Sequence, residues 1–444
     1  MMIPQTTPLR PETALCSNLD RRDGHLRFAG QDTIELAKTY GTPLYLMDED
    51  RVRHNCRLYR EAFSTCFPEG SQVLYASKAA AFQQMCRIVG DEGLGLDVVS
   101  SGEIHTAKTA GFPMARVYYH GNNKTDEDIA YAMDAGVGCF VADGTEELLA
   151  LESEAARRGV RQKVLLRITP GIDPHTYAAV STGQVDSKFG VSIETGQAEP
   201  FVRLALDQPH LNVAGFHCHV GSQVFWEDVF ERSVMVMMAF IRTVFDHCGY
   251  LPEELDLGGG YGVRYVENDP EIDIPRKIAD LAEMLYAIAK RLDLPVPKIL
   301  MEPGRSIVAD AGMTLYTVGS VKEITGYKRY VSVDGGMSDN PRYALYGSQY
   351  TCFNAGRMDE TADMRCDLVG RCCESGDVIQ PDVPFPAATR RGDVIAVCTT
   401  GAYNFSMASG YNRMLRPPVV MLRGGGSYVA VARETLDDIV RLDR

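Results

Sequence analysis

The stretch QVLYASK, from Gln72 to Lys78, is a short apolar run that ends in a serine and a lysine. Similar runs return along the chain and give these candidate strands: Gln72–Ser77, Gly95–Ser100, Arg116–His120, Gly138–Ala142, Lys163–Thr169, Asn212–Val220, Glu254–Leu257 and Lys298–Met301. Segments with helical apolar spacing lie between them, such as Asp126–Ala135, Thr145–Arg158 and Ile274–Leu292. This alternation predicts an α/β fold, a closed TIM (β/α)8 barrel over residues 50–305. An open doubly wound sheet is the alternative, because periodicity does not show closure.

The pattern changes after Arg305. Short β-type runs follow at Val318–Val321, Tyr330–Val333, Val394–Val397 and Tyr428–Val431, separated by Gly, Pro and Asp clusters. The first 49 residues also read as strand and turn, and chain ends often lie close together. We therefore expect a second, mainly β domain formed by residues 306–444 and joined by residues 1–49.

Composition narrows the class of partner. The formal net charge is −14, which disfavours nucleic acid and anionic membranes because both require a basic surface. The beginning of the chain lacks the pattern of a secretion signal, and the most apolar helical stretch, Val234–Ile241, is interrupted by Arg242. The 12 cysteines include no CxxC pair, which is typical of reduced thiols. We expect a cytoplasmic protein with a small-molecule partner and no nucleic-acid or membrane partner.

Reacting groups of parallel barrels gather where the strands end. Those positions are rich in polar and glycine residues here: Lys78, Asp97, Ser100, Ser101, His120, Lys124, Arg167, His217, His219, Gly258, Gly259, Gly260, Glu302 and Arg305. A lysine at such a mouth is placed to form a Schiff base, which is the anchor of pyridoxal phosphate chemistry. Lys78 alone would be weak evidence, so the prediction depends on the set.

Three consecutive glycines, Gly258 to Gly260, would let backbone N–H groups approach a phosphate. A helix beginning directly after them would add a favourable dipole, and Ser222 would offer a further donor. The alternative for an isolated triple glycine is a flexible turn after a strand. Together with Lys78, the pattern favours a phosphate site.

His217 and His219 lie two residues apart on a predicted strand, so both side chains should point to the same face. Such a pair with a carboxylate could bind zinc in a metal-dependent hydrolase. The other interpretation is that one imidazole stacks on an aromatic cofactor while the other is a core histidine. The triple glycine suits a phosphate better than a metal, and we predict no metal.

Glu302 follows a buried-type strand and would need a cation or donor as partner. A protonated pyridine nitrogen is such a partner, and a carboxylate there strengthens the electron sink that decarboxylation requires. Arg305 and Arg342 are candidates for bidentate binding of a carboxylate or phosphate. Either arginine could instead be an ordinary surface residue.

As a set, these residues resemble the fold-type III pyridoxal-phosphate decarboxylases over nearly the whole chain. The motifs that carry the resemblance are YASKA (75–79), GLDVVSSGE (95–103), HGNNK (120–124), STGQVDSKFG (181–190), GFHCHVGSQ (215–223), LDLGGGYG (255–262), EPGRSIV (302–308), CESGD (373–377) and GAYNFSMASGYN (401–412). Any one motif could arise by chance, but nine in the family's order are a strong signal.

The resemblance implies roles for particular residues. The expected cofactor contacts are Lys78 as the covalent anchor, His219 stacked on the ring, Glu302 at the ring nitrogen, and Ser222, Gly258, Gly259, Gly260, Arg305 and Tyr403 around the phosphate. The expected substrate contacts are Arg305, Arg342 and Tyr346 toward the distal carboxylate and Glu374 toward the distal amino group, with Tyr403 as a further contact. Cys373 would be the general acid, donated together with Glu374 across a homodimer interface. Cys372 precedes it, and adjacent residues of an extended segment point oppositely, so only one thiol should face the site.

The resemblance also implies a reaction: decarboxylation of meso-2,6-diaminopimelate to L-lysine and CO2. A decarboxylase for another basic or carrier-bound amino acid is the near alternative, and the metal-dependent hydrolase is the remote one. Glu374 with Arg342 and Tyr346 favours a substrate that carries a second amino-acid head. The loop Pro170–Gly190, rich in Gly, Ser and Thr, is a candidate lid.

Overall fold

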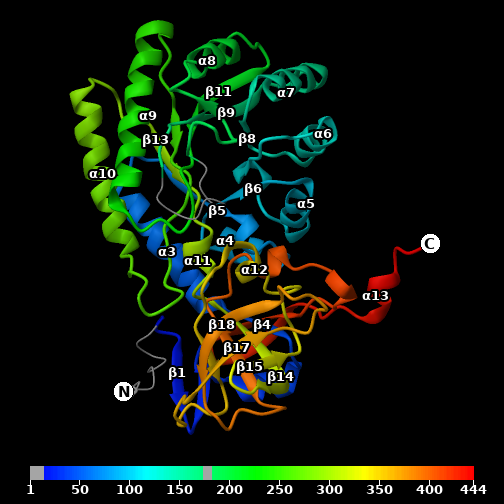
Figure 1. Cartoon of the computed structure of the whole chain (residues 1–444). Helices are drawn as coiled ribbons and strands as arrows, with labels where there is room; N and C mark the ends of the chain where they lie inside the picture. Colours follow the sequence, from blue (N-terminus) through cyan, green and yellow to red (C-terminus); the bar gives the residue numbers. More distant parts are fainter. Residues whose placement is uncertain (1–14, 174–182) are drawn as a thin grey trace. The chain divides into compact units, whose positions relative to one another are not determined.

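The computed structural model describes residues 15–173 and 183–444, and the chain falls into two compact units (Figure 1). One unit holds Arg53–Gly262 and Ile272–Ile307, and the other holds the described residues through Val52 together with Val263–Glu271 and Val308–Arg444. The segment Val263–Glu271 has no counterpart in the boundaries expected from the sequence. That residues 50–305 fold as a domain of their own stays a prediction.

The first unit contains a closed barrel of parallel strands. In chain order they are β5 (Gln72–Ala76), β6 (Gly95–Val98), β7 (Val117–Tyr119), β8 (Cys139–Ala142), β9 (Gln162–Thr169), β11 (Leu211–His217), β12 (Glu254–Asp256) and β13 (Lys298–Met301). Each pairs in parallel with its neighbour, and the pairing of β13 with β5 closes the cylinder. The predicted barrel is confirmed, and the open sheet is wrong. A two-residue strand, β10 (Val191–Ser192), adds to β9 outside the ring.

Helices follow the strands and lie around the outside of the barrel (Figure 1). They are α3 (Glu49–Cys66), which precedes β5, then α4 (Gln83–Asp91), α5 (Ser101–Ala110), α6 (Asp126–Ala135), α7 (Thr145–Arg158), α8 (Ala198–Leu206), α9 (Glu227–Cys248) and α10 (Ile274–Arg291), with a short α11 (Arg305–Val308) after β13. Local sequence sets their ends. In α6, Thr125 and Asp128 form a reciprocal capping box, and Gly136 adopts the left-handed conformation at the other end.

The middle of the barrel is apolar, with a buried cluster of Leu74, Tyr118, Cys139, Val141, Leu165, Ala214 and Leu300. A polar network fills the end where the strands begin: Lys163 Nζ lies 2.6 Å from Glu254 Oε1, and the Tyr118 hydroxyl donates to Glu254 Oε2 at 3.1 Å. The end of the barrel where the strands begin therefore stabilises the fold. The reacting groups gather at the opposite end.

The second unit is mainly β. Its large sheet contains β4 (Leu44–Asp48), β14 (Gly312–Ile324), β15 (Lys328–Val333), β16 (Cys352–Asn354), β17 (Met364–Val369), β18 (Val378–Phe385), β19 (Val394–Cys398), β20 (Val419–Arg423) and β21 (Gly426–Val431). Strand β4 pairs antiparallel with β14 and parallel with β20, which confirms that the N-terminal segment joins this sheet. The strands predicted from the sequence did not include β16, β17, β18 or β20.

Smaller elements complete the second unit. They are β1 (Leu19–Arg22), β2 (His25–Phe28), β3 (Gln31–Asp32), α2 (Thr33–Tyr40), α12 (Arg342–Tyr346) and α13 (Leu436–Val440). The apolar run Val234–Ile241 belongs to α9 of the barrel. Among the described residues, no helix combines the length and apolar character needed to cross a membrane.

Candidate active site

Lys78 lies directly after β5, in a single 3-10 turn formed by Ser77–Ala79. Its side chain is exposed, whereas Ser77 and Ala79 on either side are buried and fix the turn. The Ser77 hydroxyl donates to Glu103 Oε2 at 2.7 Å. Burial lowers the pKa of the His219 imidazole well below its usual value, and the positive charge of Lys78 lowers this pKa further. The lysine thus stands at the same barrel mouth as His219, as the sequence predicted.

The loops that follow β11 and β12 are joined by backbone hydrogen bonds. The Val224 N–H donates to the Gly260 carbonyl at 2.9 Å, and the Gly262 N–H donates to the Val224 carbonyl at 3.0 Å. Gly258 and Gly260 have φ of 68° and 129°, values that residues with a side chain rarely adopt. A Cβ on Gly259 would lie 2.1 Å from the Glu302 carbonyl oxygen, so this close approach also requires glycine.

Ser222 and Arg305 meet beside these glycines. The Arg305 guanidinium donates from Nε and Nη2 to Ser222 Oγ at 3.2 and 3.1 Å. No helix begins directly after the triple glycine, since residues 261–273 are irregular and α10 begins at Ile274. The predicted helix dipole at this point is wrong, and backbone N–H groups, Ser222 and Arg305 are left as the means of binding an anion.

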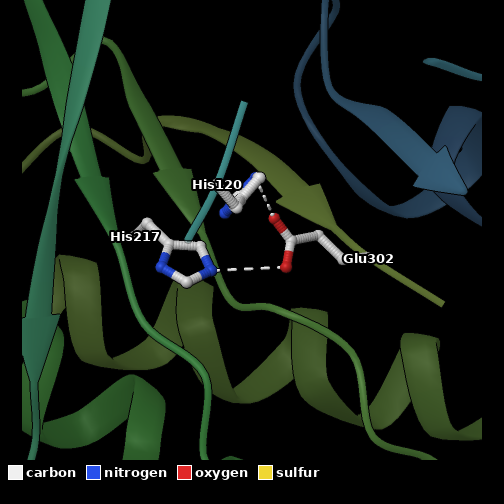
Figure 2. A group of neighbouring side chains, drawn as sticks. All are labelled: His120, His217 and Glu302. Carbon is white, nitrogen blue, oxygen red and sulfur yellow. Dashed lines mark hydrogen bonds and ion pairs between the residues drawn. The ribbon is translucent and has the colours of Figure 1, made fainter. Parts of the chain in front are cut away.

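Glu302 follows β13 and is buried between two imidazoles (Figure 2). Its Oε1 lies 2.7 Å from His120 Nε2, and its Oε2 lies 3.3 Å from His217 Nε2. Burial alone would raise the pKa of this carboxyl group, but the two imidazoles outweigh it and hold the pKa well below the usual value. Glu302 is therefore ionised at neutral pH.

The strand that carries His217 is shorter than predicted. Strand β11 ends at His217, so His219 lies beyond it and the expectation of two histidines on one strand is wrong. The Gly259 N–H donates to His219 Nδ1 at 3.3 Å, which assigns the proton of the neutral ring to Nε2. The hydrolase hypothesis paired His217 with His219, but it is His120 that shares Glu302 with His217; these three donor groups lie within 4.8 Å of one another.

Three predicted substrate residues lie together in the second unit. Arg342 begins α12 and is buried, and its Nη2 donates to Ser348 Oγ at 3.2 Å. The guanidinium carbon lies 5.4 Å from the ring centres of both Tyr346 and Tyr403. Stacked contacts of this kind hold an arginine in one orientation. Arg342 is therefore not an ordinary surface arginine.

The two adjacent thiols differ in exposure, although residues 371–373 form a bend and not the extended segment expected. Cys372 is buried, whereas Cys373 is exposed and its backbone N–H donates to Asn412 Oδ1 at 2.7 Å. The Glu374 carboxylate next to it accepts from the Gly376 N–H at 3.2 Å, which lowers the pKa of this exposed group. Of the two thiols, Cys373 is the one accessible to a reacting molecule.

Sequence reasoning gave no role to two buried groups near Glu302. His120 follows β7, and Asp256 ends β12 directly before the glycines. Burial, and then the charge of Glu302, raise the pKa of Asp256 well above its usual value. Their positions at strand ends were the only available signal. The candidate lid, Pro170–Gly190, includes residues 174–182, which lie outside the described residues.

A parallel barrel with an accessible lysine, a glycine-rich anion site and a buried carboxylate at one mouth defines an enzyme that uses a phosphorylated carbonyl cofactor. The family model described as pyridoxal-dependent decarboxylase, pyridoxal binding domain, matches residues 49–309. The chain belongs to this pyridoxal-dependent decarboxylase family, in the group of the diaminopimelate decarboxylases.

The relatives cover more than nine-tenths of the chain. Diaminopimelate decarboxylase of Bacillus subtilis is 43% identical over 95% of each chain. The solved diaminopimelate decarboxylase of M. jannaschii in complex with L-lysine has a TM-score of 0.87 at 34% identity, covering 96% of this chain and 98% of that one. The enzyme of Helicobacter pylori, also complexed with L-lysine, has a TM-score of 0.84 at 31% identity and covers 93% and 99%.

The residues present fit pyridoxal phosphate. Within the described part of the chain, Glu302 Oε1 is buried and accepts no well-aligned hydrogen bond, although His120 lies beside it. A protonated ring nitrogen would supply the missing donor. Ser222 and Arg305 beside the glycine loop offer donors that a phosphate requires, whereas the Gly258 and Gly259 N–H groups donate to Asp256 Oδ1 at 2.8 Å and His219 Nδ1 at 3.3 Å. The family's cofactor therefore accounts for features that the chain alone leaves unexplained.

Proposed function

We propose that the protein removes CO2 from meso-2,6-diaminopimelate and releases L-lysine. The observation that carries the chemistry is the buried, ionised Glu302 at the same barrel mouth as Lys78 and the glycine loop. The choice of substrate is supported by a diaminopimelate decarboxylase that is 43% identical over 95% of each chain. Two solved relatives in complex with L-lysine support it further.

When bound, pyridoxal phosphate supplies a reactive aldehyde and a ring that accepts the electron pair left when CO2 departs. Lys78 would hold the aldehyde between turnovers and later displace the product. The backbone of Gly258 to Gly260, with Ser222 and Arg305, would bind the phosphate, and Tyr403 would add a contact. His219, a neutral imidazole with its proton on Nε2, would lie flat on the ring.

Other residues would act on the substrate. Arg342, Tyr346 and Arg305 would bind the carboxylate that is retained, and Glu374 would bind the distal ammonium. Cys373 would deliver a proton to the carbon that has lost CO2. A thiol suits this step because its ordinary pKa of about 8.5 lies close to working pH.

Cys373 and Glu374 would reach the substrate from the partner subunit of a homodimer, so each site would need two chains. This arrangement is a proposal from the family resemblance, supported here by the exposure of Cys373. The location of the protein in the cytoplasm is likewise a proposal. It is supported by 12 cysteines of which the described structure pairs none.

A panel of amino acids tests the choice of substrate. We expect CO2 release from meso-2,6-diaminopimelate to exceed that from ornithine, arginine and lysine by at least about 100-fold in kcat/KM, because these substrates lack the distal carboxylate and would leave Arg342 without a partner. The absorption spectrum recorded alongside reports whether cofactor is bound. Faster release from ornithine would contradict the assignment and favour a different basic substrate on the same fold.

A further inference from the structure

Each oxygen of Glu302 lies close to an imidazole nitrogen. The two contacts come from separate strand ends: His120 follows β7 and approaches Oε1, whereas His217 ends β11 and approaches Oε2 (Figure 2). The two imidazole centres lie 4.8 Å apart, edge to face. A carboxylate with a neighbour at each oxygen has less freedom to turn than one with a single contact.

The backbone that carries the His120 imidazole is fixed. The His120 backbone N–H donates to the Val98 carbonyl at 2.8 Å, and the next carbonyl, that of Gly121, accepts from Lys124 Nζ at 3.0 Å. The Lys124 side chain is buried and also contacts Glu147 Oε1 at 2.7 Å, which ties the His120 loop to α7. His217 is a residue of the barrel strand and is fully buried.

Titratable groups from three other strands face this cluster. A carboxylate oxygen of Asp97 in β6 lies 3.8 Å from His120 Nε2. Asp256 of β12 interacts electrostatically with Glu302, and Arg167 of β9 does so with His217. Burial raises the pKa of Asp256 well above its usual value and lowers the pKa of His217 to about 4, so His217 is uncharged near neutral pH. A neutral His217 can donate from Nε2 to Glu302 only if its proton is on that nitrogen.

We propose that His120 and His217 are a pair of positioning residues that keep Glu302 ionised and aimed at the cofactor's ring nitrogen, and so determine whether that nitrogen keeps its proton during turnover. The inference rests on the proposed function. Without the two imidazoles, burial would raise the pKa of Glu302 and favour its protonated form. The ring nitrogen would then lose its partner, and the electron sink would weaken.

The test compares His120→Gln, His217→Gln and the double variant with the wild type. Glu302→Gln is the benchmark for a lost carboxylate, and His210→Gln is the matched control, because His210 Nδ1 lies 2.7 Å from Glu152 Oε1 in a half-exposed pair away from the mouth. Each protein is loaded with pyridoxal phosphate that carries an isotope label at the ring nitrogen. The nitrogen chemical shift is followed from about pH 6 to about pH 9, because this range brackets neutral working pH.

The wild type and His210→Gln should keep the ring nitrogen protonated over the whole range. The double variant should lose that proton within the range, as Glu302→Gln does, and its kcat should fall about 10- to 100-fold with little change in KM, the size expected for misplacement of a catalytic group. A ring nitrogen that stays protonated in the double variant, while the wild type decarboxylates normally, overturns this inference and leaves the proposed function standing. A wild type that binds no cofactor overturns both.

A second measurement needs no variant. The tautomer of His217 can be read from the side-chain nitrogen resonances of the wild-type holoenzyme. We expect the proton on Nε2, facing Glu302. A proton on Nδ1 would leave no donor toward Oε2 and would overturn the inference even if the variants failed to fold.

Discussion

A carboxylate buried in a barrel is costly unless charged or polar groups offset its lost hydration, and Glu302 has two imidazoles for this purpose. The sequence predicted Glu302 itself, because a Glu directly after an apolar strand needs a partner. It could not predict His120 as one of those partners. Residues 120 and 302 lie on distant strands, and only closure of the barrel brings them together.

The pH dependence of stability should reflect His217. Burial lowers its pKa from 6.5 to about 4 in the folded protein, so between these values only the unfolded chain binds the proton. The stabilisation that neutral His217 gives the folded protein is complete above pH 6.5, the pKa in the unfolded chain, and is lost as pH falls to about 4. Its size is about 3 kcal/mol if His217 acts alone. Thermal unfolding of the cofactor-free protein, measured from neutral pH downward, should show a smaller loss for His217→Gln. Equal losses in the two proteins would argue against a neutral buried His217.

At the scale of elements, the ends of strands carry the chemistry and are the hardest part to predict. Asn212–Val220 was expected as one strand, but β11 stops at His217 because the chain then turns toward the glycine loop. Periodicity locates the apolar body of a strand well. It does not show where hydrogen bonding to the next strand ceases.

Gly259→Ala should damage the cofactor site. The added Cβ would lie 2.1 Å from the Glu302 carbonyl oxygen, so the backbone must shift. We expect a loss of about 1–3 kcal/mol in unfolding free energy, typical of overpacking, together with weaker binding of pyridoxal phosphate measured by absorbance titration. Gly102→Ala on α5 is the control, since its Cβ would meet only Ser100 Oγ at 3.7 Å. Wild-type affinity in Gly259→Ala would show that this loop does not bind the phosphate.

Glu254→Ala should separate stability from activity. Glu254 lies where β12 begins and pairs with Lys163 and Tyr118, at the end of the barrel away from Lys78. Its loss leaves Lys163 without this partner, and because that lysine is partly exposed we expect a cost of about 1–3 kcal/mol, seen as a lower unfolding temperature. The value of kcat/KM should not change. Glu199→Ala, which removes an exposed pair with Arg203 on α8, is the control and should cost little.

For the whole molecule, the alternation of strand and helix was sufficient to predict the barrel, and the change of pattern after Arg305 was sufficient to predict a second sheet. The segment Val263–Glu271 could not be assigned, because nine residues between two barrel elements have no periodicity of their own. Strands such as β16 escaped for a similar reason, since three residues are too few to show alternation.

Mixing two inactive variants tests whether sites are shared between subunits. Lys78→Ala and Cys373→Ala should each be inactive alone. When the two are co-refolded, mixed dimers would contain one site with both native residues, and about a quarter of wild-type activity should return if dimers form at random. Cys372→Ser in place of Cys373→Ala is the control and should already be active by itself. No recovery on mixing would mean that Lys78 and Cys373 of one chain serve the same site.

The most direct test of the central claim is to treat the holoenzyme with borohydride, digest it and locate the phosphopyridoxyl group by mass spectrometry. The account predicts one modified peptide, with the label on Lys78, and no label in Lys78→Ala. A label on another lysine, or a holoenzyme that binds no pyridoxal phosphate, would contradict it.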